Sequence, residues 1–432
     1  MSDTKLAVMS DTNQLALEEL VKKVFADRQA KQTFLKDKVT VGWPVYDEKE
    51  ILEALDSLLD LRISQGPKVK AFEAAAAEYV GTKYAVAVNS GSSANLLALS
   101  ALLESGDLKK GTEVIIPAAT FATVASPIIQ LGLVPVYVDV DENSWNINPA
   151  EIAKAITDKT GVIMPVHSFG NPADMEAILQ LARKHNLLVL EDCCEAHGAR
   201  IGDKVVGSFG DLSTLSFFVA HNINTGEGGM VFTNNKKYYD ILLSLREFGR
   251  LTEEVIREHR FDYDDPVLKN YDARYIFTRL GYNMRMTDIE AALGLAQLKK
   301  LDELNKKRIA IVGQYQNALA KYKKYFQLPE VRDNTFHSFY GYPFLIKPDA
   351  LFTRPELVQF LEDKNIETRT FFGGCLPDQP GFREQNHRVV GELFVSRNIR
   401  DRAVFIGCHP SISEAQVEYV IKTFADFFGK FI

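Results

Sequence analysis

Four short segments of the chain carry residues that could bind a ligand or move a proton. The first, residues 89–94, reads Asn-Ser-Gly-Ser-Ser-Ala and directly follows an apolar, β-rich run. Small residues and a glycine there would expose several backbone N–H groups at the positive end of a helix, which is a ready phosphate site. No Gly-Lys-Ser/Thr follows, so the segment is not a P-loop. A plain strand-to-helix turn remains open for this segment taken alone.

The second segment is an acid pair, Glu191 and Asp192, at the end of the apolar run 187–190. A carboxylate buried at a strand end costs free energy unless it meets a cation or a hydrogen-bond donor. A protonated pyridine nitrogen would be such a partner. A helix N-cap for the following segment is the alternative.

The other two segments are irregular stretches that follow apolar runs. Residues 216–229 contain His221 and three glycines, and a histidine in such a loop is a candidate general base. For a lone histidine, a purely structural role is the more common one. Residues 281–288 contain Asn283 and Arg285 and end in Thr287 and Asp288, either of which could cap the helix that follows.

Alternating strands and helices must position these segments. Seven short apolar runs separated by helical patterns predict strands at residues 84–88, 113–116, 134–138, 161–166, 187–190, 214–218 and 229–233. Such alternation favours an α/β domain with a largely parallel sheet, and runs without polar residues are typical of strands covered on both faces.

The remaining segments predict helices around this domain and a change of rhythm after about residue 320. Helices are expected at 13–31 (amphipathic), 48–61, 68–79 and, as one long element, 286–319; a later strand is expected at 342–346, with helices at 354–364 and 414–428. We therefore expect an N-terminal helical extension at 1–45, a large α/β domain at 46–320 and a small C-terminal α+β domain at 321–432.

The composition describes an ordinary soluble protein. The chain has 432 residues, 46% of them hydrophobic, and a formal net charge of −7, which does not support nucleic-acid binding. No run approaches the ~18 apolar residues of a membrane helix, and the polar N-terminus is not a signal peptide, so a cytoplasmic location without membrane contact is expected. The four cysteines, at 193, 194, 375 and 408, are too few for a disulfide scaffold.

Taken in order, the four segments resemble the sugar aminotransferases and dehydratases among the fold-type I pyridoxal-phosphate enzymes. The resemblance runs from about Trp43 to the C-terminus and includes Pro165-Val166-His167 before Gly170 and the run 291–295, Ala-Ala-Leu-Gly-Leu. It implies the fold-type I aminotransferase fold, an α/β fold whose large, cofactor-binding domain has a mostly parallel sheet flanked by helices. It also implies a homodimer with shared active sites.

The resemblance also implies roles for matching residues. Gly91, Ser92 and Ser216 would hold the cofactor phosphate, and Asn283 would reach the phosphate in the neighbouring subunit. Asp192 would pair with the pyridine nitrogen, and Phe121 would stack on the ring. Glu195 stands where many relatives have glutamine near the ring hydroxyl. The nucleotide-sugar would lie near Arg285, His337, Ser338 and Arg369, although each could equally be a solvated or capping residue.

Position 221 departs from the aminotransferase pattern Ser-Phe-x-x-x-Lys, because histidine replaces the lysine that forms the Schiff base. Histidine at this place marks the sugar 3-dehydrases, which use pyridoxamine phosphate to deoxygenate nucleotide-linked 4-keto-6-deoxyhexoses on the way to 3,6-dideoxysugars. A C3 dehydratase, a lyase with His221 as its base, is therefore expected. The alternatives are a sugar aminotransferase with an altered or engineered lysine and an inactive paralogue, which should have lost the cofactor contacts.

The cysteines separate two kinds of 3-dehydrase. The body of the chain looks closest to the CDP-4-keto-6-deoxyglucose 3-dehydrases, in which one cysteine after the Glu-Asp pair and three in a later loop hold an iron–sulfur cluster. Cys193 matches the first, but residues 248–260 contain no cysteine. We therefore expect no iron–sulfur cluster and no metal. The route of GDP-4-keto-6-deoxymannose 3-dehydratase is expected instead, with ammonia released, glutamate as amino donor, and CDP slightly ahead of GDP as the nucleotide.

Overall fold

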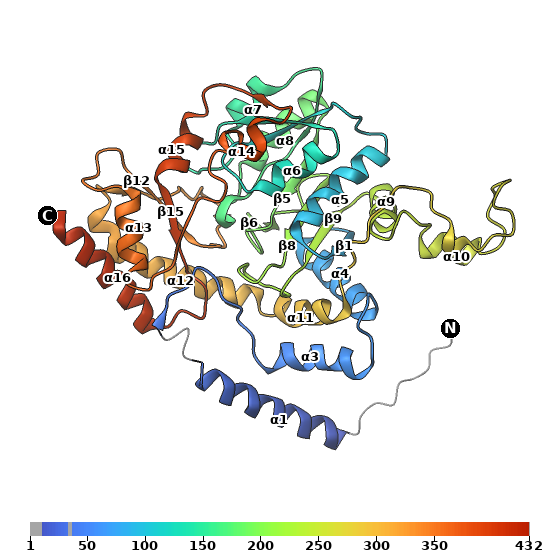
Figure 1. Cartoon of the computed structure of the whole chain (residues 1–432), viewed down its shortest axis with the longest axis horizontal. Coiled ribbons are helices and arrows are strands. Elements are labelled where there is room, and N and C mark those ends of the chain that lie inside the picture. Colours follow the sequence, from blue (N-terminus) through green and yellow to red (C-terminus); the bar gives the residue numbers. More distant parts are fainter. Residues whose placement is uncertain (1–10, 33–36, 432) are drawn as a thin grey trace.

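The computed structural model describes residues 11–32 and 37–431, and its centre is one large sheet (Figure 1). The sheet has eight strands in the order β1-β9-β8-β5-β4-β2-β3-β14. β9 is antiparallel to both neighbours and the other pairings are parallel. The strands are β1 (Tyr84–Val88), β2 (Glu113–Pro117), β3 (Val134–Val138), β4 (Thr160–Ile163), β5 (Leu188–Asp192), β8 (Leu212–Ser216), β9 (Gly229–Thr233) and β14 (Arg388–Val389). The predicted α/β class with a mostly parallel sheet is confirmed.

Helices cover both faces of this sheet because successive strand residues point to opposite sides. Ile116 of β2 packs in the core formed with α5 (Gly91–Glu104), α6 (Ala122–Gln130) and α9 (Lys236–Arg246). Ile115 packs on the other face with α7 (Pro149–Ala155) and α8 (Met175–His185). On that same other face, α4 (Pro67–Val80) and α11 (Asp288–Leu298) cover β1 and β9.

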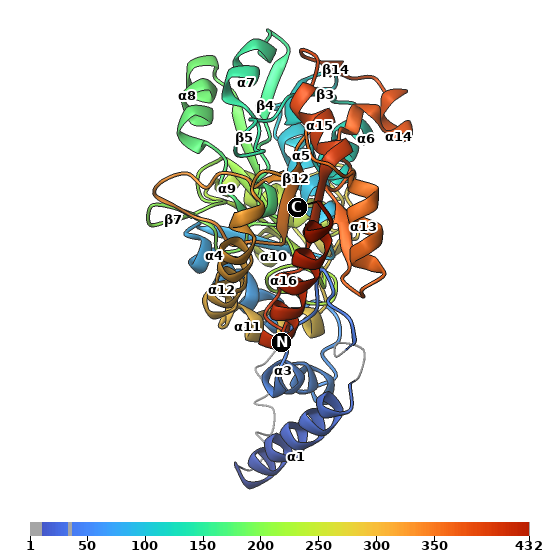
Figure 2. The same ribbon diagram turned by 90° about the vertical axis from the view of Figure 1, so that its left-hand side faces the viewer.

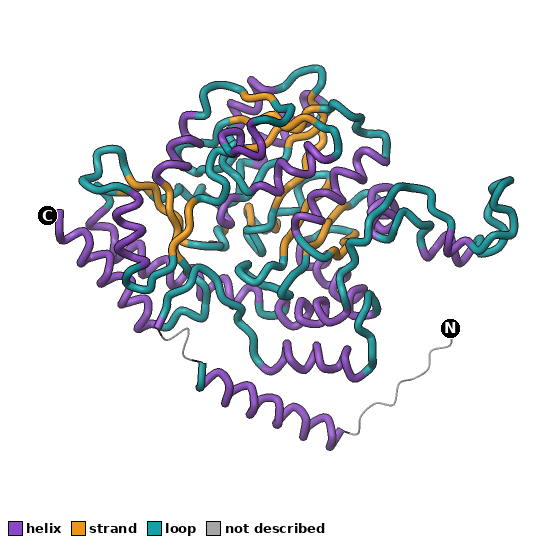
Figure 3. The backbone as a smooth tube through the Cα atoms, in the orientation of Figure 1, coloured by secondary structure: helices purple, strands orange, loops and turns teal. Residues whose placement is uncertain are grey.

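A second, antiparallel sheet lies at the C-terminal side of the molecule, apart from the large one (Figure 3). Its order is β10 (Phe326–Gln327), β12 (Tyr342–Ile346), β15 (Ala403–Ile406) and β13 (Thr368–Thr370). It shares a core of its own with α12 (Leu301–Leu319), α13 (Arg354–Glu362) and α16 (Glu414–Phe428). The C-terminal segment also returns to the large sheet through β14, and the domain boundaries at 45 and 320 stay predictions.

Several smaller elements complete the chain. The hairpin β6 (Arg200–Ile201) and β7 (Lys204–Val205) pairs with β11 (Thr335–Phe336). The short helices are α10 (Glu253–Glu258), α14 (Pro380–Arg383) and α15 (Phe394–Arg402), and α10 lies on an arm that projects from the body (Figure 1). None of the helices in the described ranges is both long and apolar enough to span a bilayer.

The N-terminal helix α1 (Asp11–Ala30) lies outside the main body, beside α3 (Glu48–Leu59), as Figure 2 shows. Its apolar residues Leu17, Val21 and Phe25 are half-buried, but Leu15, Leu20 and Val24 are exposed. The predicted helix is present, and its apolar residues are not confined to one face.

The expectation of one long helix over 286–319 is wrong. The chain forms two helices there, α11 and α12, which are separated at Lys299 and Lys300. The amine of Lys300 forms ion pairs with Glu50 of α3 and, at 3.1 Å, with Asp47, the N-cap of α3. Helical periodicity continues through this break, so a local pattern does not reveal a bend that accompanies contacts with a distant segment.

Candidate active site

The carboxyl ends of β5 and β8 bring the central residues of the site together. The two strands are parallel and pair Asp192 with Thr214, so Asp192 and Ser216 lie at the same edge of the sheet. Ligands in parallel α/β sheets bind at such an edge. His221 follows in the loop after β8, and the carboxyl end of β1 reaches the same edge, because Val88 and Ser216 both pair with Gly229.

Asp192 is a buried carboxylate, only 4% exposed, held by two neutral donors. The side-chain amide of Asn95 donates to Oδ2 at 2.8 Å, and the main-chain N–H of Cys194 donates to Oδ1 at 3.0 Å. Asn95 is itself held by the hydroxyl of Thr214, which donates to its Oδ1 at 2.7 Å. Throughout residues 11–32 and 37–431, no lysine, arginine or histidine forms an ion pair with Asp192. The site therefore offers an oriented carboxylate that has no cationic partner among these residues. A protonated pyridine nitrogen requires a carboxylate of this kind.

The N-terminus of α5 lies directly against Ser216. The side chain of Ser90 caps the helix by accepting from the N–H of Ser93. A Cβ atom added to Gly91 would fall 2.4 Å from Cβ of Ser216, so only glycine allows this approach. Ser92 is exposed at the first turn. Free N–H groups and two hydroxyls at a helix N-terminus fit a phosphate.

His221 lies in a pocket of aromatic rings. Its ring centroid is 5.5 Å from that of His197 and 5.2 Å from that of Tyr340. Its Nδ1 is buried and has no hydrogen-bond partner in the part of the chain that the structure describes. Burial, together with the nearby His197 and the guanidinium of Arg308, lowers the pKa of His221 well below its usual value. The imidazole is therefore uncharged at neutral pH and able to accept a proton.

Glu195 and Phe121 lie around the same edge. The carboxyl of Glu195 accepts from the main-chain N–H of Phe169 at 2.8 Å. Burial raises the pKa of Glu195 well above its usual range, Asp192 adds to the rise, and the Phe169 N–H opposes it. A protonated Glu195 can donate a hydrogen bond as glutamine would. Phe121 is 51% exposed and meets Phe372 edge to face at 6.4 Å.

The residues predicted to contact the sugar nucleotide differ in their surroundings. His337 and Ser338 are buried; the N–H of Phe339 donates to Nδ1 of His337, and burial lowers the pKa of His337 to about 3. Arg369 is exposed and forms an ion pair with Glu367. Arg285 donates to Oδ1 of the exposed Asn283 at 3.1 Å, near the end of β1. Their roles, and the reach of Asn283 into a second subunit, stay predictions.

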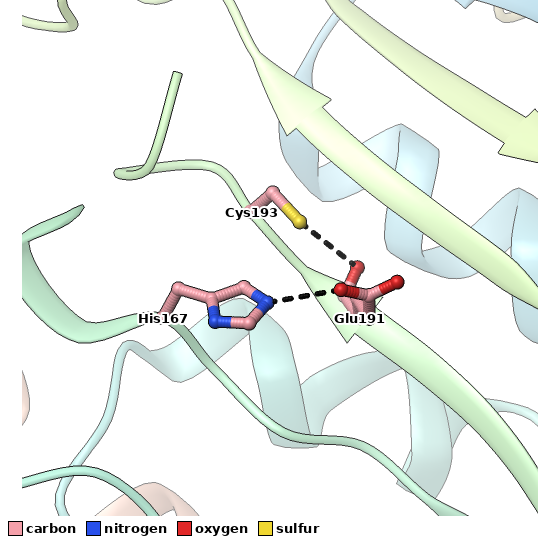
Figure 4. Close-up of side chains that lie close together, drawn as sticks. All are labelled: His167, Glu191 and Cys193. Carbon is pink, nitrogen blue, oxygen red and sulfur yellow. Dashed lines mark hydrogen bonds and ion pairs between the residues drawn. The ribbon is translucent and has the colours of Figure 1, made fainter. Parts of the chain in front are cut away.

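The second carboxylate of the acid pair, Glu191, has a different environment (Figure 4). Its oxygens accept from the N–H groups of Gly207, Phe209 and Gly210 at 2.7–2.9 Å and from Nε2 of His167 at 3.2 Å. Nδ1 of His167 accepts from the N–H of Ala173, so the ring proton lies on Nε2.

Four donors satisfy Glu191 completely, although the thiol of Cys193 also lies close by. Burial raises the pKa of Cys193 well above its usual range, with smaller contributions from Glu191 and Asp192. A protonated thiol and a fully hydrogen-bonded carboxylate are poor metal ligands. Through its hydrogen bonds, Glu191 ties the end of β5 to the loop 207–210 and to His167.

We expect Glu191→Gln to lower the free energy of unfolding by about 2–3 kcal/mol, because the amide NH₂ would face backbone donors that need an acceptor. The fall would appear as a lower midpoint of thermal unfolding. Glu142→Gln, at an exposed position, is the control and should leave the midpoint unchanged. Equal midpoints for wild type and Glu191→Gln would contradict this assignment.

Three residues of this region were not predicted from the sequence, although a sequence feature of each could have indicated it. Asn95 is a lone buried amide in the apolar run 94–97 of α5. Arg308 occupies a core position of α12, between Leu304 and Ile311 at helical spacing. His197 lies five residues after Asp192 and is buried beside His221.

Known proteins share sequence and fold with this chain. The chain is 38% identical over 397 residues to dTDP-4-dehydro-2,6-dideoxy-D-glucose 3-dehydratase of Saccharopolyspora spinosa, covering 89% of this chain and 86% of that protein. It is 35% identical over 395 residues to GDP-perosamine synthase of Escherichia coli O157:H7, covering 89% and 98%. A crystal structure of GDP-4-keto-6-deoxymannose-3-dehydratase (ColD) with bound GDP-perosamine superposes with a TM-score of 0.82 at 29% identity, covering 89% of this chain and 99% of that one. Residues 45–425 match the DegT/DnrJ/EryC1/StrS aminotransferase family, and the chain belongs to that family.

Proposed function

We propose that the protein is a pyridoxamine-phosphate-dependent C3 dehydratase of a nucleotide-linked 4-keto-6-deoxyhexose. The observation that carries this proposal is His221, an uncharged imidazole in the loop after β8, at the position where the family's aminotransferases have their lysine. Two dehydratases among the relatives described above support the reaction class. An imidazole can move a proton but cannot tether the cofactor covalently.

The described residues fit the cofactor. Pyridoxamine phosphate supplies, when bound, an amine for the C4 ketone of the sugar and a pyridine ring that accepts an electron pair. Asp192 would hold the ring nitrogen, Gly91, Ser92 and Ser216 the phosphate, and Phe121 one face of the ring. Protonated Glu195 would donate to the ring hydroxyl oxygen.

His221 would then act as the general base that transfers the proton. Its neutral imidazole would accept a proton from the aminomethyl carbon of the cofactor, and the imidazolium so formed would supply the proton with which the C3 hydroxyl leaves as water when the C3–O bond breaks. The chemistry needs one base and one electron sink, and His221 and Asp192 provide the groups for both.

We further propose that the reaction uses no iron–sulfur cluster and no reductase. The loop 248–260 contains no cysteine, and Cys193 packs with Ala196 and Ala199 on the Glu191 side of the strand end. Hydrolysis would release ammonia and the 3-deoxy sugar, and glutamate would restore the amine form of the cofactor. The enzyme would be a homodimer in which Asn283 reaches the partner's cofactor phosphate.

The test is a product assay with purified protein, pyridoxamine phosphate, glutamate and 4-keto-6-deoxyhexoses linked to CDP, GDP or dTDP. Mass spectrometry should show loss of a hydroxyl without gain of nitrogen, and no NADH or reductase should be needed. Iron with acid-labile sulfide in the active protein would contradict the cluster-free route. An amino sugar product would instead favour the aminotransferase reaction.

A further inference from the structure

Arg308 of α12 is a buried guanidinium, 1% exposed, in an unusual environment. Within the described ranges no carboxylate pairs with it, and its Nε has no hydrogen-bond partner. Its other nitrogens donate to main-chain carbonyls: Nη1 to Tyr340 at 2.9 Å and Phe339 at 3.3 Å, and Nη2 to His221 at 3.4 Å. A buried charge without a counter-ion destabilises a fold, so we expect such an arginine to have a role that compensates for this cost.

The three carbonyls belong to two segments that enclose the imidazole. One is the loop after β8, which carries His221, and the other is the segment before β12, which carries Tyr340. The ring of Tyr340 lies 5.2 Å from that of His221. A planar guanidinium that donates to both segments fixes their separation, because its N–H groups point in set directions.

We propose that Arg308 is a positioning residue for His221, which ties the main chain of the base to the segment opposite and places a positive charge next to that main chain. The inference rests on the proposed function of His221 as the base.

The electrostatic part of the proposal follows from the groups that face His221. These are His197 from the loop after β5, Tyr340 from the segment before β12 and Arg308 from α12. Burial lowers the pKa of His197 to about 3, so its ring is uncharged near neutral pH. Arg308 is thus the charged group among them, and it lowers the pKa of His221. Removing this charge raises the pKa of His221, so the imidazole remains protonated, and inactive as a base, to a higher pH.

The decisive experiment compares Arg308→Met with Arg354→Met by NMR in the cofactor-free protein. The ring resonance of His221 is assigned by its disappearance in His221→Asn, and its titration is followed against pH. The midpoint should rise by about 1 pH unit in Arg308→Met, as expected for the loss of a nearby charge. Arg354→Met is the matched control, since Arg354 also donates to main-chain carbonyls, those of Arg400 and Ala403, but lies in the C-terminal core region. It should leave the His221 midpoint unchanged.

Arg308→Lys separates the positional part from the electrostatic part. Lysine keeps the charge but not the fork of donors, so kcat should fall about 10-fold at constant KM while the acid limb of the pH profile stays in place. An unchanged His221 titration in Arg308→Met, an equal shift in Arg354→Met, or a wild-type kcat in Arg308→Lys would overturn the proposal. The NMR result does not depend on turnover, so failure of the proposed dehydration would be recognised separately by the product assay.

Discussion

Replacing His221 by asparagine is expected to lower kcat for dehydration by about 10³-fold, because a general base commonly contributes 10²–10⁴-fold and no other described side chain takes its place. His221 is the titratable residue in the loop between β8 and Gly226, whereas the neighbouring His197 lies in the loop after β5 and its Nδ1 already accepts from the N–H of Ile223 at 3.4 Å. The measurement is single-turnover conversion of the sugar, followed by mass spectrometry. Binding of pyridoxamine phosphate should be retained.

His221→Lys supplies the second half of this test. A lysine at this position restores an amine that can form a Schiff base and transfer the proton, so an amino sugar should appear among the products. A wild-type dehydration rate in His221→Asn would contradict the assignment of the base. Loss of cofactor binding in that variant would instead indicate that His221 is a cofactor ligand.

Replacing Asp192 by asparagine is expected to lower kcat by about 10²–10³-fold, the usual cost of removing one preorganised electrostatic partner. The amide keeps the shape of the side chain, and its oxygen can still accept from the N–H of Cys194. It cannot hold a positive charge on the ring nitrogen, however, so the ring becomes a weaker electron sink. The measurement is kcat at saturating sugar and cofactor.

Asp211→Asn is the matched control for this variant. Asp211 also lies next to a strand of the large sheet and accepts from the N–H of Val189 at 2.8 Å, but it precedes β8, at the opposite edge from the site. It should leave kcat unchanged. Equal effects of the two substitutions would show that the loss in Asp192→Asn comes from damage to the sheet.

Much of the fold was predictable because its signals are local. The predicted bounds of β1, β3, β9, β12 and α16 agree with the structure, since each is a short apolar run or a clear helical period between turn residues. β14 was missed because it has two residues and forms only by pairing with β3 across more than half of the chain. At the break before α12, Lys300 likewise contacts a distant segment, α3 and its N-cap Asp47.

The sequence by itself determined which chemistry is available. It has a histidine, His221, in the stretch after one apolar run, an acid pair after another, and no cysteine at 248–260, and these are facts of composition and order. Only the tertiary structure showed that the two carboxylates of the acid pair have different partners. Adjacent strand residues point to opposite faces, so Asp192 meets Asn95 at the site while Glu191 meets His167 and three backbone donors.

The same holds for Arg308, which reaches carbonyls 87 and 32 positions away in the chain. Burial, the direction of a side chain and the charge that faces a titrating group are properties of contacts between distant segments. They become visible only when the chain is folded.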